Sequence, residues 1–157
     1  MTQREGTLAA YRAAADLAGV PLSEIFLRQE ASASGKPEAE LREVMRSRIQ
    51  VMRQSLEKGL SVPQHSRSGL IKGGAARMHQ WLGTGGSLLG PAFSRMIAAA
   101  LAVAEVNACM GRVVAAPTAG ACAVLPAAIF TVADARQAGR EVIARTRLPN
   151  RTPWPVL

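Results

Sequence analysis

The sequence of 157 residues predicts an all-α domain, and three observations support that prediction. Apolar residues make up 48% of the chain, which is enough to fill a core, and alanine dominates them. Apolar positions recur at helical spacing in several segments, whereas strand-like alternation persists in none. Glycine and proline residues separate these segments. We therefore expect one helical domain whose alanine-rich central helices are buried.

Two helices are expected in the first part of the chain. The first covers residues 7–18 and ends at Gly19, because glycine readily adopts the left-handed conformation that terminates helices. Ser23 is expected to cap a second, short helix with its hydroxyl group. The stretch of small residues at positions 31–35 is then predicted to be a linker.

A long amphipathic helix is expected next, from Pro37 at its first position to an end at Gly59. Two glutamates in its first turn suit the positive end of the helix dipole. Its apolar residues share one face: Leu41, Val44, Met45, Met52 and Leu56. The segment is predicted to form one wall of the domain.

The central part of the chain alternates loops and helices. Residues 60–74 are rich in Ser, Gly and Pro, which indicates a structured loop before a short helix over residues 75–82. Residues 91–110 are apolar on nearly every side, which is typical of a buried central helix. A tight loop at residues 117–120 leads to another buried helix, which either kinks at Pro126 or begins near it.

Charge and composition exclude several classes of protein. The net charge is +8, but half of that excess lies in residues 136–157, and the few aromatic residues are scattered. We therefore expect no nucleic-acid partner, because base stacking needs aromatics interleaved with basic residues. The longest purely apolar run, residues 96–104, is too short for a bilayer span. The N-terminus lacks the apolar segment of a secretory signal, so we expect a cytoplasmic protein that binds no membrane.

The segment Pro117-Thr118-Ala119-Gly120 is the first candidate for a binding site. Proline fixes one backbone angle, and glycine permits a conformation that other residues rarely adopt. If the next helix starts here, free N–H groups and the positive dipole end would suit a carboxylate or phosphate. The alternative is a tight connection between two helices.

The second candidate is the glycine-rich loop over residues 66–74. Its small residues would form a backbone nest for an anion, with Lys72 as a local positive charge. The nest residues are Ser68, Gly69, Gly73 and Gly74. The spacing fits neither the P-loop nor the dinucleotide-binding fingerprint, so an ordinary loop is the alternative.

Histidines and cysteines provide few further candidates. His65 and His79 match no short metal-binding motif, so each is expected to form ordinary hydrogen bonds. Cys109 is expected to pack as a small apolar residue. Cys122 would lie near a helix N-terminus, where it is either a reactive thiol or an inert core residue. Two cysteines exclude a four-cysteine metal site within this chain, so no metal ligands are expected.

Two segments resemble a known family. Residues 105–120 read EVNACMGRVVAAPTAG, which resembles the hallmark stretch of the iron–sulfur-dependent L-serine dehydratase (L-serine ammonia-lyase) alpha chain. Ser68-Gly69-Leu70 with Gly73-Gly74 resembles the earlier glycine loop of that family. The resemblance runs in consistent order from about residue 21 to residue 135.

The resemblance implies a lyase that converts L-serine into pyruvate and ammonia, in amino-acid degradation and gluconeogenesis. It implies a helical catalytic domain and a 4Fe-4S cluster in which one iron acts as a Lewis acid. The substrate-binding residues would be Ser68, Gly69, Pro117, Thr118, Ala119 and Gly120. The resemblance assigns no general base to this sequence.

Three departures from the family pattern affect these expectations. Where the family has a serine, then a small residue or cysteine, then a glycine, this chain has Ala121-Cys122-Ala123, so the serine and the glycine are lost. Ile71-Lys72 replaces smaller or uncharged residues. The family's later half, which carries the cluster cysteines, has no counterpart here. We therefore expect a truncated N-terminal portion over residues 1–135, with little activity alone. Residues 136–157 would be a disordered or unrelated basic tail, of the kind a reading-frame shift produces.

A second function from a different class is a helical interaction module. Such a subunit would pair with a separate chain that carries the cluster cysteines, or with a second copy of itself. Nucleic-acid binding ranks last, because the charge excess lies largely in the tail.

Overall fold

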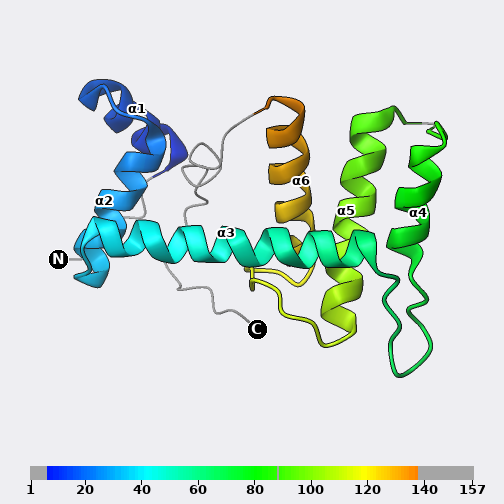
Figure 1. The fold of residues 1–157 in the computed structure, drawn as a ribbon. Helices are drawn as coiled ribbons and strands as arrows, with labels where there is room; N and C mark the ends of the chain where they lie inside the picture. Colours follow the sequence, from blue (N-terminus) through cyan, green and yellow to red (C-terminus); the bar gives the residue numbers. More distant parts are fainter. Residues whose placement is uncertain (1–6, 88, 138–157) are drawn as a thin grey trace.

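The computed structural model describes residues 7–87 and 89–137, and within these ranges it contains six helices and no β-strand (Figure 1). The helices are α1 (Leu8–Ala18), α2 (Leu22–Ser34), α3 (Glu38–Ser61), α4 (Gly74–Gly83), α5 (Pro91–Ala108) and α6 (Ala121–Ala135). The predicted all-α fold is therefore confirmed. Within these ranges, no helix is both long enough and apolar enough to cross a membrane.

The helices form one layer with a single helix across it. α4, α5 and α6 make up the layer, and the long helix α3 crosses it (Figure 1). α5 runs opposite to α4 and α6, so it ends at the edge of the layer where those two helices begin. α1 and α2 lie at the N-terminal end of α3, away from α4. There Arg42 of α3 donates to both carboxylate oxygens of Glu24 of α2, at 2.9 and 2.7 Å.

The core lies between α3 and the pair α5 and α6. Its buried members are Val51, Met52, Leu56, Ala99, Val103, Val106, Val113, Val114, Ala123, Ala127, Phe130 and Ala133. Alanines on α5 and α6 within this core allow the helices to approach closely. α5 and α6 are buried on their core side only, however, and each keeps apolar residues exposed on its opposite side.

Gly59 does not end α3, contrary to the sequence prediction. The helix continues to Ser61, and Gly59 is buried within it. A Cβ atom at Gly59 would overlap the backbone carbonyl of Ala102 on α5. The glycine therefore serves close packing between two helices, and the helix ends only where Val62 adopts an extended conformation.

The predicted boundaries of α2 were also wrong. Pro21 is the N-cap, and Ser23 lies inside the helix without a capping role. The stretch predicted as a linker, residues 31–35, continues the helix to Ser34, because alanine and serine are compatible with helical backbone. Gly35 then ends it in the left-handed conformation, with φ +68°.

Smaller differences concern the other boundaries. Pro37 is the N-cap of α3 rather than its first residue. α5 ends at Ala108, two residues before the predicted end at Met110. α6 begins at Ala121, directly after the predicted tight loop at residues 117–120, and continues through Pro126. The predicted tail lies outside the described residues except for its first two positions.

Candidate functional site

Both predicted binding loops lie at the same edge of the helical layer. One loop, residues 62–73, leads from α3 into α4, and the other, residues 109–120, joins α5 to α6 (Figure 1). The N-termini of α4 and α6 therefore lie at this edge, with the C-terminus of α5 at the same edge. Helix N-termini carry partial positive charge and unpaired N–H groups, so this edge suits an anionic ligand.

Thr118 caps α6. Its Oγ1 atom accepts a hydrogen bond from the N–H of Ala121 at 3.2 Å, and its backbone carbonyl accepts from the same N–H at 3.0 Å. Gly120, which directly precedes the helix, bonds through its carbonyl to the N–H groups of Ala123 and Val124. The side chain that the sequence singled out as a ligand donor thus also fixes the start of the helix.

Gly120 does not adopt the strained conformation that the sequence predicts for it. Its φ of −69° and ψ of −35° are ordinary helical values. No atom lies within 4 Å of the place where its Cβ would be. The absence of a side chain therefore leaves open space over the first turn of α6, where a ligand can approach the backbone.

Three backbone N–H groups at this turn are available to a ligand. Within the described residues, the N–H groups of Ala119, Gly120 and Cys122 donate no hydrogen bond. Residues 117–120 are exposed to solvent. The turn consequently has the geometry of a small anion site, in which amide groups and the helix dipole act together.

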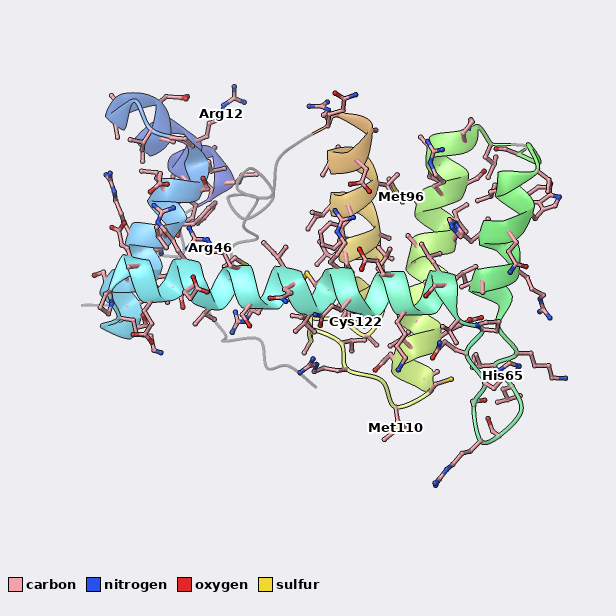
Figure 2. All side chains as sticks on the ribbon, in the orientation of Figure 1. Arg12, Arg46, His65, Met96, Met110 and Cys122 are labelled. Atoms are coloured by element: carbon pink, nitrogen blue, oxygen red, sulfur yellow. The ribbon has the colours of Figure 1, made fainter. Side chains whose placement is uncertain are left out.

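Cys122 contributes to the shape of this turn. Its Sγ, on the side chain labelled in Figure 2, donates to the carbonyl of Ala119. The bond at 2.7 Å joins the loop to the first turn of α6. The thiol is half-buried, as is that of Cys109 at the C-cap of α5.

Ser66 organises the glycine loop. Its hydroxyl accepts from the N–H of Ile71 at 3.0 Å, and its carbonyl accepts from the N–H of Gly69 at 3.0 Å. The Ser68 hydroxyl lies 3.1 Å from the Ser66 hydroxyl. Ser68 is at the exposed tip of the loop, beside Gly69, whose φ is +73°. Ser66 was not among the predicted nest residues, although a serine beside the turn residues is a recognisable signal.

Glu105 was missed as a site residue, and it occupies the N–H group of Gly74, one residue of the predicted nest. Its Oε1 atom accepts from the N–H of Gly74 at 2.8 Å and from that of Ala75 at 3.3 Å. The amide groups at the start of α4 are therefore taken by a carboxylate of this chain and do not form an anion site. Glu105 was visible in the sequence as a rare acid in an apolar helix.

The donors for a metal cluster do not assemble here. Among the described residues, no three side chains of His, Cys, Asp or Glu lie close enough together to hold a metal ion. His65 contacts the carbonyl of Pro63 at 3.2 Å, and the Cys122 thiol donates to a backbone carbonyl. These residues do not fit a 4Fe-4S cluster, so we derive no chemical step through one.

A pocket of about 280 Å³ lies at the opposite end of α4, between that helix and the start of α5. His79, Ser87 and Arg95 are among its lining residues. None of the predicted substrate-binding residues lines it. The pocket is therefore separate from the two loops.

Comparison with known proteins identifies similar sequences. A family model described as "Serine dehydratase alpha chain" matches residues 17–147, beyond residue 135 where the sequence predicts the resemblance to end. The "Probable L-serine dehydratase, alpha chain" of Bacillus subtilis (strain 168) is 32% identical over 124 residues, which cover 79% of this chain and 41% of the relative. The "L-serine dehydratase, alpha chain" of Peptoniphilus asaccharolyticus is 32% identical over 116 residues, covering 74% and 40% respectively. The chain thus spans about two fifths of these relatives. No solved structure matches significantly.

Proposed function

Because the chain belongs to the serine dehydratase alpha-chain family, we propose that it takes part in converting L-serine into pyruvate and ammonia. The names of two relatives at 32% identity support this substrate and this reaction. In this proposal the chain supplies part of the serine-binding site of a cytoplasmic lyase.

The turn at the start of α6 would bind the serine carboxylate. The observation that carries this assignment is the set of N–H groups without a hydrogen bond at exposed Ala119 and Gly120 and at half-buried Cys122. The Thr118 Oγ1 accepts from Ala121, so its O–H remains to donate to a carboxylate oxygen. Pro117 holds the turn, while Ser68 and Gly69 from the other loop would form a second wall.

Loss of water from serine also requires removal of the α-proton and activation of the hydroxyl group. The described residues provide no ligand set for a cluster, and we assign neither step to them. We propose that the family's 4Fe-4S cluster is held by cysteines outside this sequence of 157 residues, whose two cysteines are Cys109 and Cys122, so that this chain alone has little dehydratase activity. Anaerobic reconstitution followed by a pyruvate assay tests this, and substantial turnover would refute it.

Replacing Thr118 with valine should weaken L-serine binding about tenfold, because the variant loses one hydrogen bond to the ligand and the side-chain bond to the N–H of Ala121. Titration calorimetry with L-serine measures the change. Thr84→Val is the matched control, since Thr84 also bonds its hydroxyl to the backbone, at the far end of α4. Equal affinities for the two variants would show that Thr118 does not contact the ligand.

A second candidate function is pairing with a separate chain that carries the cluster cysteines. It is favoured by exposed apolar residues on the side of α5 and α6 opposite the core: Phe93, Leu101, Val124 and Val132. The two relatives are named as alpha chains and are more than twice as long as the part matched here. Co-purification of a brown, cluster-bearing complex would support this function, whereas self-association into a dimer would favour a second copy instead.

A further inference from the structure

Glu105 is a buried acid between α5 and α4. It is 8% exposed, although its neighbours along α5 are mainly alanine and valine. One carboxylate oxygen, Oε1, accepts from the first two N–H groups of α4. The other oxygen, Oε2, is buried and has no hydrogen-bond partner among the described residues. The polar contact that the structure shows for this side chain is therefore its bond to the start of α4.

The backbone around this contact is closely packed. A Cβ atom on Gly74 would lie 3.1 Å from Oε1, so the carboxylate rests directly against the start of the helix. Gly73 has a φ of +70° and packs against Pro63, at the other end of the same loop. The loop over residues 62–73 is thus closed on itself, and Glu105 connects its end to α5.

We propose that Glu105 is a positioning residue that fixes the start of α4 against α5 and thereby sets the position of Ser68 and Gly69. Its consequence for substrate rests on the proposed function, in which those two residues form one wall of the serine site. Because only Oε1 accepts hydrogen bonds from α4, this role requires one acceptor oxygen on a side chain as long as that of glutamate. A negative charge on a shorter side chain would not be sufficient to hold the start of α4.

Three variants of Glu105 distinguish the effect of side-chain length from the effect of negative charge. Glu105→Gln keeps an acceptor oxygen at the same reach, Glu105→Asp keeps the charge but is one methylene shorter, and Glu105→Ala removes both. Amide hydrogen exchange at Gly74 and Ala75 should be at least about tenfold faster in the Asp and Ala variants and within about threefold of the original in the Gln variant. Ser94→Ala is the matched control, because Ser94 is another buried polar residue of α5 and bonds to Ser87.

Circular dichroism establishes which variants fold. A folded Asp or Ala variant with unchanged exchange at Gly74 and Ala75 would overturn the proposal. If the Asp and Ala variants do not fold, a folded and protected Gln variant supports it, and an unfolded or unprotected Gln variant overturns it. Faster exchange in Ser94→Ala at the same two amides would also overturn it, since the effect would not be specific to Glu105.

L-serine titration separates this proposal from the proposed function. If both hold, the Asp variant binds L-serine about tenfold more weakly than the Gln variant does. If the unsubstituted chain does not bind L-serine while the exchange pattern is as expected, the proposed function fails and the positioning role stands. If the chain binds L-serine and the Asp and Gln variants bind it equally, the link between Glu105 and the serine site is refuted.

Discussion

Replacing Gly59 with alanine is expected to destabilise the chain by about 2–3 kcal/mol, the upper part of the range for overpacked cores. The added methyl group would overlap the backbone carbonyl of Ala102, and backbone cannot move aside as a flexible side chain does. α3 and α5 would have to separate, which opens the core between Leu56 and Val103. Denaturant unfolding followed by circular dichroism measures the loss.

Gly83→Ala is the control for this prediction. Gly83 is also a helical glycine, at the end of α4, but no atom lies within 4 Å of its missing Cβ. Alanine there should change stability by less than about 1 kcal/mol, because it gains helix propensity without a clash. If both variants unfold at the same denaturant concentration, the close approach of α3 to α5 is refuted.

Replacing Leu101 with lysine is expected to weaken pairing with a cysteine-bearing dehydratase chain at least about a hundredfold. Leu101 is 42% exposed on the side of α5 away from the core, so lysine can extend into solvent and the isolated chain should keep its fold. In a complex that covers this side, the ammonium group would be buried without a partner. Calorimetric titration with the cysteine-bearing chain of the same source measures the affinity.

Leu17→Lys serves as the control for Leu101→Lys. Leu17 is 90% exposed on α1, at the opposite end of α3 from the helical layer. The two substitutions add the same charge, so a general effect of charge would weaken both complexes equally. Unchanged affinity in the Leu101 variant would show that the partner does not cover this side of α5.

Several features of the fold are predictable from the sequence because they are local. Periodic apolar residues locate α3, and Pro91 together with an apolar run locates α5. The end of α3 was mispredicted because Gly59 is a normal stop signal, while its contact with Ala102 on another helix has no local signature. The stretch at residues 31–35 was mispredicted because small residues suit both a linker and a helix.

The part of the candidate site that depends on local sequence is also predictable. The position of Thr118 at the start of α6 follows from the loop and the apolar run after it, and the structure places the residue there. The bond from Glu105 to Gly74 joins residues that are 31 positions apart, and sequence spacing gives no indication of such a partner. An acid in an apolar helix indicates that a partner exists without indicating which one.

In the proposed function, the first turn of α6 binds the carboxylate of L-serine. Titrating the isotope-labelled chain with L-serine, while the backbone amide resonances of Ala119, Gly120 and Cys122 are followed by NMR, tests it most directly. We expect saturable shifts at these three amides, and none with 2-aminoethanol, which lacks the carboxylate. Saturable shifts confined to the pocket at His79 and Arg95, or the same response to both compounds, would contradict it.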